Sequence, residues 1–209
     1  MRGLIDKDSK YSLVDDIETA DIIIINTCGF INDAKEESIE IIIEAGEYKE
    51  KGNCRALIVT GCLSQRYQNE LMDMMPEIDA MLGTGNFGEI IETMDKALSG
   101  ERFKNIAEPK FNYTHSKPRN LITKHYSYVK IAEGCNNNCS YCIIPELRGP
   151  VRSRSISDIY SEVQNLADQG VKEIILVAQD ITQYGIDLKG NQNLSKLLKK
   201  LITVKDIVW

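Results

Sequence analysis

Residues 126–142 read YSYVKIAEGCNNNCSYC, a stretch that predicts a β-strand running directly into a loop with three cysteines. The strand is expected over Tyr126–Ala132, where aromatic and β-branched residues gather. A helix from about Ser157 to Gln169 and a buried strand over Glu173–Gln179 follow. This alternation predicts a parallel sheet with helices on its faces. We therefore expect an α/β fold with the cysteine loop directly after a strand.

The first hundred residues show the same alternation. In the helix expected from Asn32 to Lys51, the apolar stripe is formed by Ile39, Ile42 and Ile43. These elements predict a three-layer domain with a parallel sheet over residues 1–100. Its expected strands are Ala20–Asn26, Ala56–Thr60 and Ala80–Leu82, and its other helices are Leu63–Met75 and Phe87–Leu98.

Residues 101–124 are rich in Lys, Asn, Pro and Thr and lack periodicity, which predicts a linker. The second domain, residues 125–209, closes with a helix over Leu194–Ile202 and a strand that only begins at Ile207–Trp209. Because a further strand and helix are expected after it, we interpret the chain as a fragment of a longer protein.

Length and composition describe an ordinary soluble globular protein. The chain has 209 residues, 43% hydrophobic and 27% charged, which excludes collagen-like, disordered and coiled-coil classes. No apolar run reaches the ~18 residues of a membrane span and no signal peptide is evident, so we expect a cytoplasmic protein without a membrane partner. Six cysteines in such a chain favour metal or redox chemistry over disulfides.

The charge is unevenly spread between the two expected domains. Residues 1–100 hold 9 Lys and Arg against 20 Asp and Glu, a net charge of −11. Residues 101–209 hold 16 Lys and Arg against 11 Asp and Glu, a net charge of +5. Only the second domain is therefore suited to an anionic partner.

The strongest chemical signal is the C-x3-C-x2-C loop formed by Cys135, Cys139 and Cys142. A [4Fe–4S] cluster is usually held by four cysteines, so three leave one iron open to chelate a substrate or cofactor. The alternatives are a zinc site and incidental cysteines. Structural zinc favours four ligands in paired spacings, and no second pair is present near this loop.

This loop, with Tyr141 before its last cysteine, resembles the signature of radical S-adenosylmethionine enzymes. The resemblance implies that Cys135, Cys139 and Cys142 are the catalytic cluster ligands. It also implies that the open iron binds S-adenosyl-L-methionine and yields a 5′-deoxyadenosyl radical. The implied fold is a partial (β/α)6 barrel, with Tyr126–Ala132 as its first strand and its chemistry at the C-terminal strand ends.

The whole chain further resembles the methylthiotransferases, through Asn26-Thr27-Cys28-Gly29-Phe30 and Gly61-Cys62-Leu63 as well as the cluster loop. Other motifs resemble the branch of this family that modifies a ribosomal protein more than the branch that modifies a tRNA adenosine. They are Ala34-Lys35-Glu36-Glu37-Ser38, Ala132-Glu133-Gly134-Cys135, Leu147-Arg148-Gly149-Pro150, Arg152-Ser153-Arg154, Ala178-Gln179-Asp180 and Tyr184-Gly185.

The resemblance implies methylthiolation of an aspartate β-carbon in ribosomal protein S-twelve. It further implies two [4Fe–4S] clusters, an electron donor such as flavodoxin or ferredoxin, and a monomer. The alternatives are the tRNA-modifying relative and a non-catalytic, zinc-bearing interaction domain. The C-terminal half of the barrel and the RNA-binding-type module of the family are missing here, so we expect the chain alone to be inactive.

Cys28 and Cys62 each follow an expected parallel strand, so both emerge at the C-terminal edge of the sheet. The resemblance makes them ligands of the auxiliary cluster, whereas the simpler interpretation is two buried apolar thiols. The family's first auxiliary cysteine lies in a segment that this chain lacks, so we expect an incomplete site. Cys54, at the other end of its strand, is expected to be a structural or surface thiol.

Five further residues are candidates for contact with S-adenosylmethionine. Gln179 and Asp180 end the second expected barrel strand, where they could bind the amino group or merely cap a helix. Arg152 and Arg154, with Arg148, could hold a carboxylate or form a solvated basic turn. Tyr141 could pack on adenine or shield the cluster.

Two other features are weaker. The glycines of Gly83-Thr84-Gly85-Asn86-Phe87-Gly88 match a dinucleotide-binding pattern, but their context favours a tight turn with close helix packing. His115 and His125 have no partner spacing, and we assign them no role.

Overall fold

Four strands of the N-terminal unit, Met1–Phe111, form one parallel sheet in the computed structural model, which describes residues 1–109, 121, 123 and 125–209. The strand order is β1-β2-β3-β4. In the register of the first pair, Thr27 stands opposite Gly61, so β1 and β2 end at the same level. The strands are β1 Ile22–Thr27, β2 Ala56–Gly61, β3 Ala80–Leu82 and β4 Phe103–Asn105.

Strand β4 corrects the expected linker. Phe103–Asn105 pairs with β3 in parallel register, so the first unit extends beyond residue 100. The segment carries no β-branched residue, and its strand conformation comes from the neighbour that it pairs with. Within the expected linker, residues 110–120, 122 and 124 lie outside the described residues, and so does His115.

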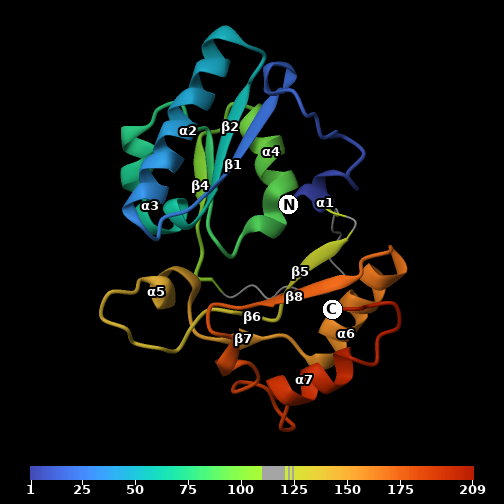
Figure 1. Cartoon of the computed structure of the whole chain (residues 1–209). Coiled ribbons are helices and arrows are strands. Elements are labelled where there is room, and N and C mark those ends of the chain that lie inside the picture. The colour runs from blue at the N-terminus through green and yellow to red at the C-terminus, as the bar shows by residue number, and fades with distance from the viewer. Residues whose placement is uncertain (110–120, 122, 124) are drawn as a thin grey trace. The chain divides into compact units, whose positions relative to one another are not determined.

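Helices cover both faces of this sheet, which confirms the predicted three-layer α/β architecture (Figure 1). Helices α2 and α3 pack on one face through Ile42 and Leu63. Helices α1 and α4 pack on the other through Ile5 and Ile90. The bounds are α1 Arg2–Ile5, α2 Asn32–Lys51, α3 Cys62–Met74 and α4 Ile90–Leu98, with short 3-10 turns at Ile17–Thr19 and Phe87–Glu89.

Helix α2 has the predicted bounds but a narrower buried face than its sequence suggests. Ile42 is fully buried and Ala45 packs beside it in the core. Ile39 is 37% exposed and Ile43 is 53% exposed, contrary to a stripe buried along its full width. Both side chains instead line a groove of about 560 Å³ shared with residues of α3.

The second unit, Asn112–Trp209, pairs β5 (Tyr126–Lys130) with β8 (Glu173–Val177) in parallel. Helices α6 and α7 pack on these strands around Val129, Ile159 and Leu197. The further elements are β6 Ala132–Glu133 antiparallel to β7 Arg152–Ser153, α5 Ile144–Arg148, α6 Ile156–Asp168, the 3-10 turn Ile181–Gln183 and α7 Leu194–Leu201.

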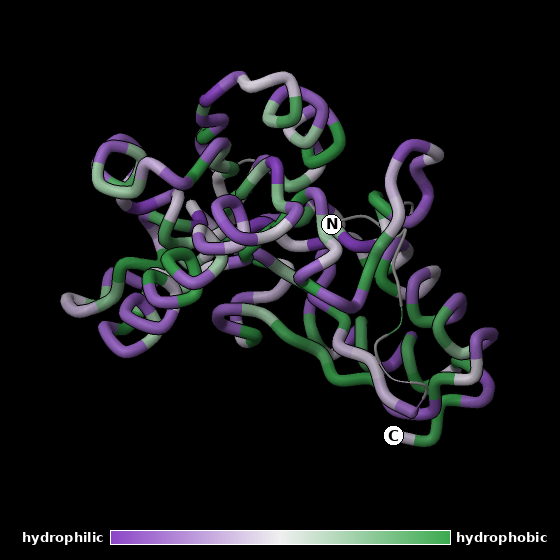
Figure 2. The backbone as a smooth tube through the Cα atoms, turned by 90° about the horizontal axis from the view of Figure 1, so that it is seen from above, coloured by the Kyte–Doolittle hydropathy of each residue, from purple (hydrophilic) through white to green (hydrophobic). Residues whose placement is uncertain are grey.

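The last residues run beside β8 without forming an assigned strand. The Ile174 N–H donates to the Trp209 carbonyl at 2.8 Å, and the Val208 N–H donates to the Lys172 carbonyl at 2.7 Å. Figure 2 shows hydrophobic residues at this end of the chain. These two bonds place residues 207–209 beside β8, although the structure assigns no strand where Ile207–Trp209 was expected to begin one. None of the helices that the structure describes has the length and apolar character needed to cross a bilayer.

Gly61, at the end of β2, provides a test of this packing. Its φ of 104° and ψ of −153° suit only glycine, and a Cβ would lie 2.5 Å from the Thr27 carbonyl oxygen. Gly100 has φ 85° with nothing within 4 Å of a Cβ, so Gly100→Ala should cost only about 1–2 kcal/mol from its backbone conformation. We expect Gly61→Ala to lower the free energy of unfolding by more than Gly100→Ala, measured by urea denaturation. Equal losses would contradict the close approach of β1 and β2.

Candidate cluster site at the ends of parallel strands

A cavity of about 550 Å³ opens where β8 ends and the cysteine loop begins. Residues at the carboxyl ends of parallel strands meet at one edge of a sheet, and ligands of α/β folds bind there. The three cysteines of the predicted cluster therefore lie around the same space as Gln179 and Asp180. The full lining is Cys135, Asn137, Cys139, Cys142, Leu176, Val177, Ala178, Gln179, Asp180 and Ile181.

The three thiols differ in exposure, since Cys135 is buried, Cys142 is intermediate and Cys139 is exposed. Over the described part of the chain, no three His, Cys, Asp or Glu side chains converge closely enough to hold one metal ion. A cubic cluster has different needs, because each thiolate binds a different iron and the sulfurs surround the cluster. Three thiols around one cavity fit that group.

The cluster loop is anchored by backbone contacts at its base. The Cys135 N–H donates to the Gly149 carbonyl at 3.1 Å, and the Val151 N–H donates to Asn136 Oδ1 at 2.9 Å. Gly134 has φ 81°, and a Cβ there would lie 2.2 Å from the Pro150 carbonyl oxygen. Only glycine permits this close approach.

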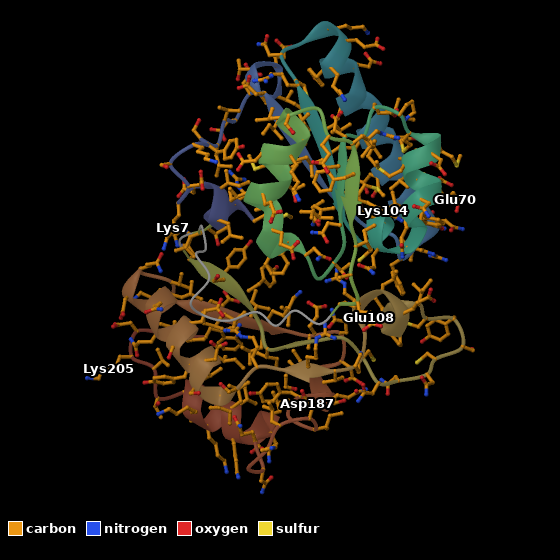
Figure 3. The ribbon with its side chains drawn as sticks, turned by 180° about the vertical axis from the view of Figure 1, so that it is seen from behind. Lys7, Glu70, Lys104, Glu108, Asp187 and Lys205 are labelled. Atoms are coloured by element: carbon orange, nitrogen blue, oxygen red, sulfur yellow. The ribbon has the colours of Figure 1, made fainter. Side chains whose placement is uncertain are left out.

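Two side chains from the segment after β8 hold strand β7 and the residue that follows it. The Ser153 N–H donates to Asp187 Oδ2 at 2.8 Å, and Figure 3 shows Asp187 in this unit. The buried Tyr184 hydroxyl donates to the Arg154 carbonyl at 2.8 Å. Burial raises the pKa of Tyr184 to about 12, so the phenol stays protonated at neutral pH. These bonds give the cluster loop a fixed base.

Asp180 bridges the end of β8 to the cluster loop. Its carboxylate accepts from Thr182 N–H at 3.0 Å and from Asn137 Nδ2 at 2.8 Å. Hydrogen bonds from Thr182 and Asn137 hold the pKa of Asp180 below its usual value. Gln183 Nε2 donates to Asp180 Oδ2 at 3.0 Å and lies 3.9 Å from Cys135 Sγ. Sequence reasoning missed Gln183 and Asn137, although Gln183 stands only three positions after Asp180.

Glu133 is a second group that sequence reasoning missed. This buried carboxylate accepts from Gln179 Nε2 at 2.7 Å and pairs with Lys130 and Arg148. Burial by itself raises the pKa of Glu133. The attraction of Lys130 and Arg148 outweighs that effect, so the pKa lies below its usual value. Glu133 is therefore ionised at neutral pH.

The arginines and Tyr141 lie outside the cavity lining. Arg154 is buried and donates to Asp158 Oδ2 and Glu162 Oε2, both at 2.6 Å. This double ion pair does not support the predicted contact between Arg154 and the cofactor. Arg152 donates to the Pro150 carbonyl at 3.0 Å and has a buried Nε with no hydrogen bond. The Tyr141 side chain is 84% exposed.

In the N-terminal unit, Cys28 and Cys62 follow the paired residues Thr27 and Gly61 of neighbouring strands. Their segments touch, because a Cβ on Gly29 would lie 2.9 Å from the Cys62 carbonyl carbon. Cys28 is exposed and Cys62 is buried. Cys54 lies before the start of β2, at the other end of that strand.

The glycine-rich turn after β3 is filled by a neighbouring side chain. Gln65 Oε1 accepts from the Thr84 N–H at 3.0 Å, and a Cβ on Gly83 would lie 2.5 Å from the same oxygen. The contact is consistent with the close-packing interpretation of these glycines.

Comparison with known protein families gives one match in each of the two structural units. Residues 1–83 match the family described as Uncharacterized protein family UPF0004, and residues 129–205 match the Radical SAM superfamily. The chain is also similar in fold to the radical S-adenosylmethionine methyltransferase TsrM from Kitasatospora setae. That likeness has a TM-score of 0.51 at 13% identity, over 77% of this chain and 37% of the other.

Curated relatives match the whole chain. The ribosomal protein uS12 methylthiotransferase RimO of Syntrophotalea carbinolica is 48% identical over 100% of this chain and 46% of its own length. The protein of the same name from Pelotomaculum thermopropionicum is 50% identical, over 100% of this chain and 47% of its own length. The chain thus spans about half the length of these relatives.

The exposure of the thiols predicts their order of reaction in cluster-free protein. Burial raises the pKa of Cys54, so it offers little thiolate and little access, whereas Cys28 and Cys139 are exposed. We expect iodoacetamide to modify Cys28 and Cys139 before Cys54, as followed by peptide mass analysis over time. If Cys54 reacts as fast as Cys139, the described packing of β2 is wrong.

Proposed function

We propose, because the chain belongs to the radical S-adenosylmethionine methylthiotransferase family, that it carries the catalytic part of an enzyme acting on ribosomal protein uS12. One observation carries the proposal. Cys135, Cys139 and Cys142 surround the cavity at the end of β8, with Gln179 and Asp180 on its wall. This donor set suits an iron–sulfur cluster that keeps one iron open for a cofactor.

In this proposal Cys135, Cys139 and Cys142 hold a [4Fe–4S] cluster whose open iron binds S-adenosyl-L-methionine. When bound, the pair supplies the 5′-deoxyadenosyl radical that abstracts hydrogen from the substrate. Gln179 provides a polar contact for the amino group of the cofactor. Arg152 and Tyr141 remain proposed cofactor contacts at the edge of the site.

The remaining wall of the cavity is apolar. Leu176, Val177, Ala178 and Ile181 give it an apolar side, which protects a reactive radical from side reactions. Asp180 has a positioning role in this scheme, because its bond to Asn137 ties the loop to the end of β8.

Cys28 and Cys62 are proposed to supply two thiolates of an auxiliary [4Fe–4S] cluster in the N-terminal unit. Their neighbouring positions at the end of β1 and β2 support a shared group. A cluster of this kind would supply the sulfur that is transferred, and a third thiolate is needed to complete its ligand set.

The proposed target is the β-carbon of an aspartate in uS12, supported by the names of the relatives and by the Ala178-Gln179-Asp180 motif. We further propose a cytoplasmic monomer that receives electrons from flavodoxin or ferredoxin.

Removing one ligand of the radical cluster tests the proposal. Cys139→Ala should abolish reductive cleavage of S-adenosylmethionine in anaerobically reconstituted protein, because two thiolates do not define one open iron. Formation of 5′-deoxyadenosine is measured by chromatography, with iron and sulfide counted in parallel. Cys54→Ala is the matched control, and it should keep both the formation of 5′-deoxyadenosine and the iron and sulfide content. Normal cleavage of S-adenosylmethionine by Cys139→Ala would contradict the assignment of Cys139 as a cluster ligand.

The two proposed clusters can be separated by a second pair of variants. In protein extended to the length of its relatives, Cys28→Ala and Cys62→Ala should still form 5′-deoxyadenosine but no methylthiolated uS12. Mass analysis of uS12 measures the product. Methylthiolation by both variants would exclude them as ligands of a sulfur-donating cluster.

A further inference from the structure

Glu133 is the last residue of strand β6, two residues before Cys135. Its side chain is only 8% exposed. Oε2 accepts from Lys130 Nζ at 2.6 Å, and Oε1 accepts from Arg148 Nη1 at 3.2 Å and from Gln179 Nε2 at 2.7 Å. The bond to Gln179 connects the base of the cluster loop to the end of β8. Glu133 itself does not line the cavity among the described residues.

The chemistry of this contact fixes the orientation of the Gln179 amide. Gln179 Nε2 donates to Glu133 Oε1 at 2.7 Å, so the amide nitrogen of Gln179 faces Glu133. The other polar atom of the amide is the carbonyl oxygen, Oε1. One N–H of Nε2 is used by Glu133, and Gln179 lines the cavity, so Oε1 keeps its acceptor capacity for a bound molecule.

We infer that Glu133 is a positioning residue that makes Gln179 an acceptor towards the cavity, suited to a positively charged ammonium group. This rests on the proposed function, in which the cofactor brings such a group as part of its amino acid. The opposite amide orientation would place an NH2 donor against an ammonium donor and repel it. Glu133 thus acts on the cofactor through Gln179, without touching it.

Affinity for two ligands tests this inference in reconstituted protein. S-adenosylmethionine carries the ammonium group, whereas 5′-methylthioadenosine lacks the whole amino-acid part. Glu133→Gln releases the fixed orientation, because an amide at 133 can donate or accept. We expect S-adenosylmethionine to bind about tenfold to a hundredfold more weakly, the usual range for a hydrogen bond to a charged group. Binding of 5′-methylthioadenosine should stay within about twofold, by the same reasoning.

Two controls separate positioning from folding. Glu162→Gln removes another carboxylate of this unit that pairs with an arginine, and it should leave both affinities unchanged. Glu133→Asp keeps the negative charge beside Lys130 and Arg148 but is one methylene shorter. It should weaken S-adenosylmethionine binding less than Glu133→Gln, and it decides the question if Glu133→Gln does not fold. Unchanged affinity in both Glu133 variants overturns the inference.

A double-mutant cycle shows whether Glu133 acts through Gln179. Gln179→Met should weaken S-adenosylmethionine binding, and adding Glu133→Gln should weaken it no further. Additive losses, or an equal loss for both ligands in Glu133→Gln, overturn the inference and indicate a merely structural role. If the unaltered, iron-loaded protein binds no S-adenosylmethionine, the proposed function itself fails.

Discussion

The parallel pairing of β5 with β8 is the constraint on which the candidate site depends. Lys130 and Val177 stand opposite each other at the last paired position, so both strands deliver the following residues to one edge. One strand leads to the cysteine loop and the other to Gln179 and Asp180. The N-terminal unit has the same arrangement, because Thr27 stands opposite Gly61 just before Cys28 and Cys62. In each unit, chemistry distant in sequence meets because parallel strands end together.

Much of this arrangement could be predicted because it rests on local signals. The helix over Asn32–Lys51 and the short strand over Ala80–Leu82 have the expected bounds. A glycine follows each of them, Gly52 after the helix and Gly83 after the strand, although the strand itself is a weak signal of only three residues. The α/β class and the resemblance to methylthiotransferases are confirmed. The spacing of the three cysteines needed no knowledge of the fold, since they are close in the chain.

Features that depend on distant contacts could not be predicted in the same way. Strand β4 carries no β-branched residue and exists through pairing with β3. Ile39 and Ile43 share an apolar pattern with Ile42, but only a narrow strip of α2 reaches the sheet. Arg154 carries a charge that suggested a ligand contact, yet two carboxylates of α6 hold it. In the first two cases the deciding neighbour is distant in the sequence, whereas the carboxylates that hold Arg154 lie only four and eight positions after it.

Three thiolates around one cavity, with one iron left to a cofactor, are the central claim. Mössbauer spectroscopy of protein reconstituted with iron-57 tests it most directly, because each iron of a cluster reports its own ligands. The account predicts a [4Fe–4S] spectrum in which S-adenosylmethionine changes one iron in four and leaves the others as they were. Four equivalent irons that do not respond to S-adenosylmethionine would contradict it, because no open position would then exist.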